Sequence, residues 1–154
     1  MNAFLSSAEG SLSRAEHAVT LFEAGANCAQ AVRSAFAPLY GVDQGTAMRL
    51  AAAFGGGMAR TGELCGAVSG ALLVIGLRYG PDRPAQQARE TCYQVARTFL
   101  QRFQESQGAL LCRDLLGCEI LTPEGRKRVH EQGWIRERCP RFVRCAVELL
   151  EELL

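Results

Sequence analysis

The chain has 154 residues, of which 48% are apolar and 21% charged, and its formal net charge is only +1. This ordinary globular composition excludes a disordered chain, and the balanced charge gives no electrostatic reason to expect nucleic acid or a membrane surface as partner. The aromatic share of 7% favours closely packed helices over an all-β sandwich. The length suits one domain, so we expect a flexible leader over residues 1–10 and a single helical domain over 11–154.

The first part of the chain predicts three helices in succession. Apolar residues recur at helical spacing until Gly25, which suits a helix C-terminal cap. Asn27 can cap a second helix that ends near Pro38. Asp43 or Thr46 can then open a third helix.

A run of three glycines, Gly55, Gly56 and Gly57, ends the third helix. Because glycine lets a backbone approach another group closely, we expect a loop here rather than a continued helix. The most apolar segment of the chain follows and predicts a central buried helix over 63–79, too short in its apolar part to span a bilayer. Glycines on one face of this helix, such as Gly66 and Gly70, are expected to let another backbone pack close.

The second part of the chain predicts a long amphipathic helix over 84–106 and a short one over 112–116. Thr122 and Cys139 are each followed by proline, a pattern typical of helix starts, so two more helices are expected to begin there. No strand pattern competes. The predicted fold is therefore all-α, a compact bundle of five to six helices with short loops and a glycine-rich loop before the central apolar helix.

The N-terminus lacks the basic and long apolar regions of a signal peptide, so a cytoplasmic location is predicted. In a reducing compartment the seven cysteines are expected to be metal ligands, redox thiols or small core residues rather than permanent disulfides. The odd number agrees, because at least one thiol cannot pair within the chain.

The cysteines divide by position. Cys92 and Cys145 lie on apolar helix stripes and are interpreted as core residues, and Cys118, near a helix end, is mainly assigned a structural role. The other four fall at or near predicted helix starts: Cys28, Cys65, Cys112 and Cys139. Unpaired N–H groups at a helix start favour the thiolate, the form that attacks disulfides and binds metals.

Basic residues gather near the same positions. Seven occur between Arg126 and Arg144 against two acidic residues, Arg60 precedes Cys65, and Arg113 follows Cys112. If these segments converge, they make a positive site for thiolates or for an anionic cluster. His17 and His130 lie on charged helices and are expected to be solvated rather than ligands. The cysteine spacing contains no Cys-x-x-Cys, so it matches no standard zinc or ferredoxin pattern.

Six segments carry recognisable motifs in order: NCAQAV at 27–32, FGGG at 54–57, RTGE at 60–63, CGAVSGAL at 65–72, CRDLLG at 112–117 and CP at 139–140. They resemble the C-GCAxxG-C-C family, which is named for four cysteines and described as redox-active. By motif those four correspond to Cys28, Cys65, Cys112 and Cys139. Leu64 precedes Cys65 where the family name has glycine, so the motif here is Cys-Gly-Ala-x-x-Gly.

The resemblance implies a redox or electron-transfer protein whose four cysteines bind an iron–sulfur cluster, [2Fe–2S] or [4Fe–4S], and which meets a redox partner protein. Backbone N–H groups of Gly55, Gly56 and Gly57 are expected to contribute to cofactor binding, together with Arg60. The protein would then be an oxidoreductase or an accessory electron-transfer module.

Three alternatives stay open at this point. The first is a thiol–disulfide oxidoreductase in which Cys28 and Cys65 form the first catalytic pair. The second is a structural or storage site for zinc or another soft metal in the same four cysteines. The third is a helical module that binds a small molecule or a partner, with cysteines serving only as packing. A homodimer through the amphipathic tail at 148–154 is also possible.

Overall fold

The computed structural model describes residues 11–154, and the predicted leader lies outside the described residues. The described part is all-α, as predicted, with no strand and one isolated β-bridge between Leu64 and Leu111. The helices number more than five to six because several are short. They are α1 (Arg14–Glu23), α2 (Cys28–Phe36), η1 (Ala37–Tyr40), α3 (Gln44–Ala51), η2 (Ala52–Phe54), α4 (Gly66–Tyr79), α5 (Gln86–Gln107), α6 (Cys112–Leu116), α7 (Pro123–Glu131) and α8 (Trp134–Leu153), where η denotes a 3-10 helix.

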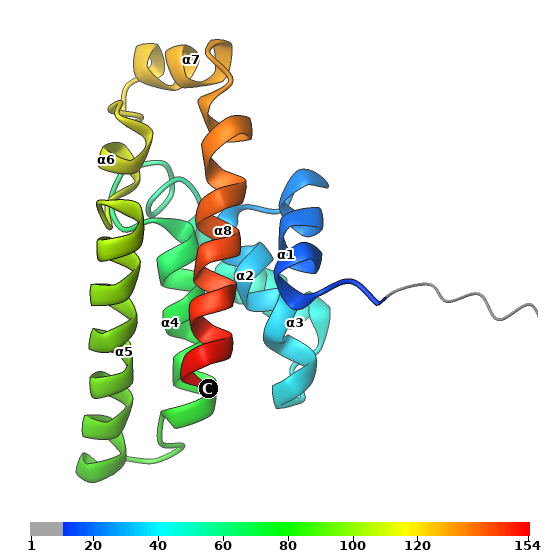
Figure 1. The fold of residues 1–154 in the computed structure, drawn as a ribbon, viewed down its shortest axis with the longest axis vertical. Coiled ribbons are helices and arrows are strands. Elements are labelled where there is room, and N and C mark those ends of the chain that lie inside the picture. The colour runs from blue at the N-terminus through cyan, green and yellow to red at the C-terminus, as the bar shows by residue number, and fades with distance from the viewer. Residues whose placement is uncertain (1–10) are drawn as a thin grey trace, which may run out of the picture.

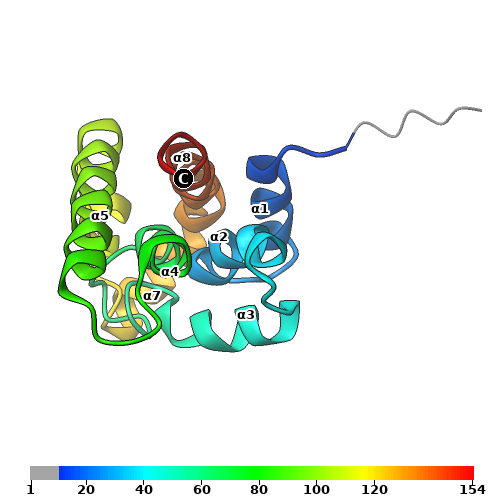
Figure 2. The ribbon, with the colours of Figure 1, turned by 90° about the horizontal axis from the view of Figure 1, so that it is seen from below.

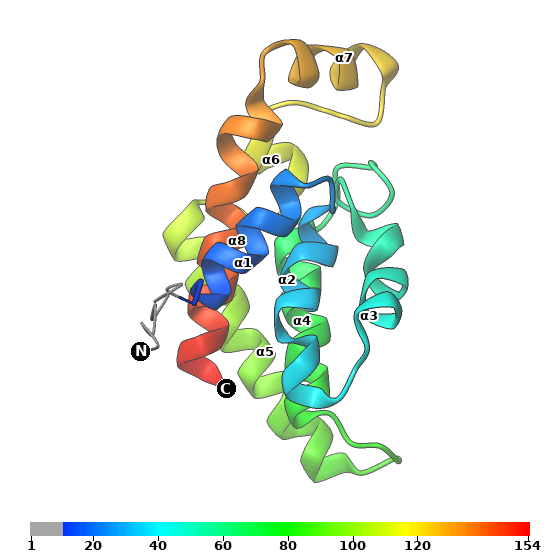
Figure 3. The same cartoon turned by 90° about the vertical axis from the view of Figure 1, so that its right-hand side faces the viewer.

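Helices α4, α5 and α8 run along the long axis of the molecule, with α1 to α3 packed on one side (Figure 1). Seen from below, α5, α8 and α1 form one layer, and α4, α2 and α3 form the other (Figure 2). The short α6 and α7 lie at the end opposite the C-terminus. The long loop between η2 and α4 lies beside α6 and the start of α2 (Figure 3).

Side-chain caps mark the starts of four of the eight described α-helices, which are α1, α2, α3 and α7. Asn27 accepts a hydrogen bond from the backbone N–H of Gln30, whose side chain accepts one from the backbone N–H of Asn27. Asp43 and Thr122 cap α3 and α7, as predicted, by accepting a single hydrogen bond from the backbone N–H of Thr46 and of Gly125 respectively. Gly25 follows α1 with φ +113°, a conformation that suits glycine at a helix end.

The prediction that the last helix begins at Cys139-Pro140 is wrong. Helix α8 begins at Trp134 after Gly133, which has φ 69°, and Pro140 lies inside it. Proline there deprives the Arg136 carbonyl of its usual helical partner, yet the helix continues through it. Cys139 is therefore more than one turn inside α8, beyond the unpaired N–H groups of a helix start.

The glycines of α4 bring it close to α2. A Cβ at Gly70 would lie 2.8 Å from the Ala29 carbonyl oxygen, and one at Gly66 would lie 3.1 Å from the Ala29 nitrogen. The expectation of close backbone packing is confirmed at these two positions. Gly76 differs, because nothing lies within 4 Å of a Cβ placed there.

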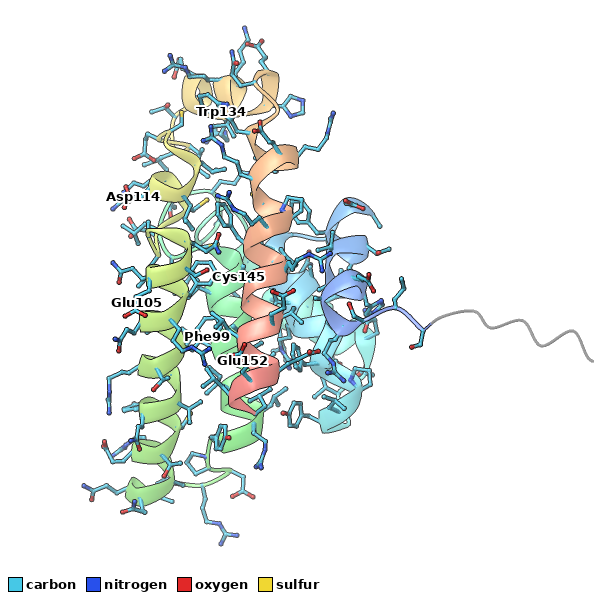
Figure 4. The ribbon with its side chains drawn as sticks, viewed as in Figure 1. Phe99, Glu105, Asp114, Trp134, Cys145 and Glu152 are labelled. Carbon is cyan, nitrogen blue, oxygen red and sulfur yellow. The ribbon has the colours of Figure 1, made fainter. Side chains whose placement is uncertain are left out.

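The core lies between the long helices, and its largest fully buried side chains include Phe36, Ile75, Phe99, Phe103 and Leu150. Figure 4 shows Phe99 and Cys145 in the region between α5 and α8. Cys92 and Cys145 pack against this core but are only half-buried. From residue 11 onward, no helix combines the length and the apolar character that crossing a membrane requires.

Candidate four-cysteine site

Four of the seven cysteines line one cavity of about 400 Å³ at the α6–α7 end of the bundle. Cys28 is the first residue of α2, Cys65 directly precedes α4, Cys112 is the first residue of α6, and Cys139 comes from α8. The structure thus brings together the four cysteines selected from the sequence. Cys92, Cys118 and Cys145 do not line this cavity.

The cavity wall is mostly apolar. The apolar side chains around it are Phe22, Leu115, Leu116, Ile120, Val129, Ile135 and Phe142. Among the described residues 11–154, its only charged lining residues are Arg60 and Arg126, and no aspartate or glutamate of that range lines it. The sequence predicted that basic residues between Arg126 and Arg144 approach the cysteines. Arg126 lines the cavity, so this is confirmed for that one residue.

Cys118, mainly assigned a structural role from the sequence, lies beside backbone carbonyl groups between α6 and α7. Its sulfur lies 3.6 Å from the carbonyl oxygen of Glu119 and 3.8 Å from that of Gly125. These weak contacts fix the turn between α6 and α7. Cys145 has a comparable contact, 3.6 Å from the Ser106 hydroxyl on α5.

The glycine loop packs directly on the segments that carry two of the cysteines. A Cβ at Gly57 would lie 2.5 Å from the Glu63 carbonyl oxygen and 2.6 Å from the Cβ of Cys112. A Cβ at Gly55 would lie 2.8 Å from the Cβ and from the Nδ2 of Asn27. Of the predicted cofactor-binding residues, Gly56 and Arg60 line the cavity, whereas Gly55 and Gly57 serve close packing.

The loop continues into a left-handed turn. Five consecutive residues, from Gly56 to Arg60, have φ between 52° and 67°, and Met58, Ala59 and Arg60 are not glycine. Left-handed backbone costs a residue with a side chain about 1–2 kcal/mol, so the surrounding structure must hold this turn. Backbone hydrogen bonds from Ala59 to Ala53 (2.8 Å) and from Glu63 to Gly57 (2.9 Å) do so. The turn delivers Arg60 to the cavity.

Backbone bonds also hold Cys65 and Cys112 beside each other. The Cys65 N–H donates to the Leu110 carbonyl (2.8 Å), and the Cys112 N–H donates to the Glu63 carbonyl (2.7 Å). Arg113, expected to add positive charge to the site, instead forms a 2.9 Å ion pair with Glu63 and does not line the cavity. The two cysteines are thus held by main-chain geometry.

A family model described as "Putative redox-active protein (C_GCAxxG_C_C)" matches residues 26–153. The chain belongs to this family. The match covers most of the chain and all four cysteines of the cavity, so the resemblance seen in the motifs is confirmed, and with it membership of a family described as redox-active. No curated protein and no solved structure matches the chain.

Burial controls the acidity of the cavity thiols. Burial raises the pKa of Cys65 to about 12, although the backbone N–H groups of Ala67 and Val68 act in the opposite direction. Burial also raises the pKa of Cys112 to about 12. The exposed fractions of these two side chains are 4% and 8%. The expectation that helix starts lower these pKa values is therefore wrong, because desolvation of the thiolate outweighs the N–H groups.

Cys28 and Cys139 form a pair. The neighbouring Cys139 side chain raises the pKa of Cys28, and the Cys28 side chain in turn lowers the pKa of Cys139. Cys139 is thus the one cavity cysteine with a lowered pKa, although it lies inside a helix rather than at its start. The cause is the neighbouring thiol, which stabilises the thiolate form.

The donor set fits an iron–sulfur cluster, which takes a thiolate on each of its outer coordination positions. Four cysteines from four separate segments face one cavity, and no carboxylate lines it. Among residues 11–154, no three His, Cys, Asp or Glu side chains form a group that could hold one metal ion.

The sequence did not indicate the apolar wall of the cavity. Phe22 ends α1, Ile120 follows α6 and Val129 lies on α7, so no motif joins them. His130, expected to be solvated, is exposed and yet lines the cavity. Phe142, Leu115 and Leu116 carried a usable signal, because each lies close to a site cysteine on the same helix.

Proposed function

We propose that this protein transfers electrons through an iron–sulfur cluster held by Cys28, Cys65, Cys112 and Cys139. The observation that carries the proposal is selective convergence. These four cysteines line one cavity, and the other three cysteines of the chain do not. When bound, such a cluster supplies reversible one-electron chemistry.

The protein's own groups favour this role. Raised pKa values keep Cys28, Cys65 and Cys112 protonated at neutral pH, so they must release protons when they become ligands. Arg60 and Arg126 offset the negative charge of the resulting thiolates. The apolar wall limits water around the sulfurs, which tunes the reduction potential of such a site.

Anaerobic purification with iron, sulfide and absorbance analysis tests the proposal. The wild-type protein should be brown, and Cys28→Ser, Cys65→Ser, Cys112→Ser and Cys139→Ser should each lose most of the bound iron and visible absorbance. Cys92→Ser and Cys145→Ser are matched controls, because these cysteines lie outside the cavity, and they should retain both. A colourless protein with stoichiometric zinc, or loss of colour only in the control variants, would contradict the proposal.

Thiol–disulfide exchange is the second candidate, and the contact between Cys28 and Cys139 favours it. We therefore propose Cys28–Cys139 as the exchanging pair, in place of the Cys28–Cys65 pair expected from the sequence. The Cys139 thiolate would attack a disulfide substrate, and Cys28 would then attack the mixed disulfide. The protein gains one disulfide, and the substrate is reduced to two thiols.

Metal-free protein treated anaerobically with oxidised glutathione tests this second candidate. The free thiol count should fall by two, and peptide mass spectrometry should identify a Cys28–Cys139 bond. Cys145→Ser should behave like wild type in this respect. An unchanged thiol count, or a bond elsewhere in the chain, rejects the exchange reaction at this pair.

An electron-transfer role requires a partner, so we also propose that this protein exchanges electrons with a redox partner protein. The cytoplasmic location, the homodimer and the division into a leader and one domain stay predictions from the sequence. Zinc in the same four cysteines stays the alternative metal, and the metal analysis above distinguishes it from a cluster.

A further inference from the structure

The four-cysteine cavity is larger and more apolar than sulfur ligation alone requires. Its volume of about 400 Å³ falls within the 300–1,000 Å³ that is typical of small-molecule sites, which are lined by apolar side chains and a few polar groups. Leu115 and Leu116 of α6 and Phe142 of α8 provide a continuous apolar surface on segments that also carry cysteines. The cavity therefore has room and lining for an organic molecule.

The charged side chains that line the cavity are both positive. Arg60 and Arg126 line it without any acidic residue, and neither arginine has an ion-pair partner within residues 11–154. Arg126 uses only Nη1 to donate to the carbonyls of Ile120 (3.2 Å) and Leu121 (2.7 Å). Those bonds hold the half-buried guanidinium against the wall and leave its other nitrogens for an anion.

The lining of the cavity extends to the surface between the end of α1 and the α7–α8 turn. Ile135, which lines the cavity, has an exposed fraction of 41%. A second hollow of about 440 Å³ shares Phe22, Val129, His130 and Ile135 with the cavity. The apolar wall thus continues from the cysteines to the surface, and a ligand can enter beside His130.

We infer that the cavity binds a small organic anion with an apolar body next to the four cysteines, its acid group paired with Arg126 and Arg60. The inference rests on the proposed function only for the role of this ligand, which would be the substrate or electron carrier of the redox centre. Binding itself follows from the volume, the apolar lining and the one-signed charge.

Two fluorescent probes with similar aromatic rings distinguish the contribution of charge to binding from that of apolar contact. They are 1-anilinonaphthalene-8-sulfonate, an anion, and N-phenyl-1-naphthylamine, its neutral analogue. Both should bind the full-length protein with one site per chain. Arg126→Met and Arg60→Met should each weaken the sulfonate about tenfold, the effect of one charge-assisted hydrogen bond, and change the neutral probe less than twofold. Arg128→Met on α7 is the control, because Arg128 does not line the cavity, and it should change neither probe.

Leu116→Trp, which places a larger side chain in the cavity, should abolish binding of both probes. Circular dichroism and the melting temperature verify that each variant is folded, and the exposed Arg60 makes Arg60→Met the variant least prone to misfold. Equal loss of both probes in the arginine variants, or sulfonate binding unaffected in Arg60→Met and Arg126→Met, overturns the inference.

Sulfonate binding and cluster content are measured separately, so failure of this inference and failure of the proposed function are distinguishable. Arginine-dependent sulfonate binding in a wild-type protein that never holds a cluster would sink the cluster proposal and leave the ligand site standing. A brown wild-type protein that binds the sulfonate without dependence on Arg60 or Arg126 would do the reverse.

Discussion

The two ends of the helical bundle use the same long helices but pack them differently. Toward the C-terminus, Ile75 of α4, Phe99 of α5 and Leu150 of α8 are completely buried among apolar side chains. At the other end α4 and α8 contribute to a cavity of about 400 Å³ beside a left-handed turn. Close packing is the default of a protein interior, so a cavity lined by four cysteines beside a strained turn marks where this chain gives up stability for a site.

Helix α8 shows the difference within one element. Cys139 and Phe142, in its first half, line the cavity, whereas Val147 and Leu150, in its second half, are buried among apolar side chains. The same amphipathic stripe therefore serves two purposes. The surface that faces this stripe changes along the helix. At one end α8 faces the cysteine-bearing segments, and at the other end it faces side chains of α4 and α5.

The largest expected effect is on core packing. Phe103→Ala should lower the free energy of unfolding by about 3–5 kcal/mol, since it removes a fully buried ring stacked on Phe99. Phe142→Ala should cost at least about 1 kcal/mol less, because one side of that ring already borders the cavity and loses fewer contacts. Urea denaturation measures both. Equal losses would mean that the cavity end is packed as tightly as the core.

Alanine substitutions at two glycines test the same difference between the cavity end and the buried core. Gly57→Ala should destabilise the protein by about 3 kcal/mol, because it adds both a left-handed alanine and a clash with Glu63 and Cys112. Gly76→Ala, in α4 with open space around the new Cβ, should stabilise it by about 0.5–1 kcal/mol. Thermal and urea unfolding test both signs. A neutral Gly57→Ala would show that the loop can rearrange.

Alkaline pH should weaken the metal-free protein through the cavity end. Cys65 and Cys112 keep their protons to about pH 12 when folded, whereas the ordinary thiol pKa is 9.0. Between these pH values the unfolded chain binds fewer protons than the folded one, so stability falls as pH rises, by up to about 1.4 kcal/mol per pH unit for each thiol. Below pH 8 this contribution is fully present.

Urea unfolding of the metal-free protein at pH 8, 9 and 10 measures this slope. Cys65→Ser should remove one part of it, because a serine hydroxyl does not titrate in this range. Cys145→Ser, toward the core, should keep the wild-type slope. If Cys65→Ser leaves the slope unchanged, burial at Cys65 does not govern its titration.

The smallest expected effect concerns the left-handed turn. Ala59→Gly should stabilise the protein by about 1 kcal/mol, since glycine adopts φ 52° without a steric penalty. Ala88→Gly in α5, where the backbone is helical, should instead destabilise it by about 1 kcal/mol. Differential scanning calorimetry of the pair resolves both shifts. If Ala59→Gly raises the stability and Ala88→Gly lowers it, the backbone strain is confined to the cavity end of the protein.

Local chemistry explains which parts of the fold were predictable. Asn27, Asp43 and Thr122 are seen as helix caps in the structure because capping involves residues only two or three positions apart. The rule that proline marks the first turn of a helix is also local, but it failed at Pro140, which lies inside α8. Nothing in Met58, Ala59 or Arg60 indicates positive φ, because only glycine and asparagine commonly signal it.

The sequence by itself determined the all-α class, the family and the division of the cysteines into four and three. Periodicity, caps and motifs carry that information over short stretches of chain. Only the tertiary structure decided that the four share an apolar cavity, that Arg126 rather than Arg113 lines it, and that Cys139 has the lowered pKa. Burial and pairing depend on neighbours contributed by distant segments, so no local pattern encodes them.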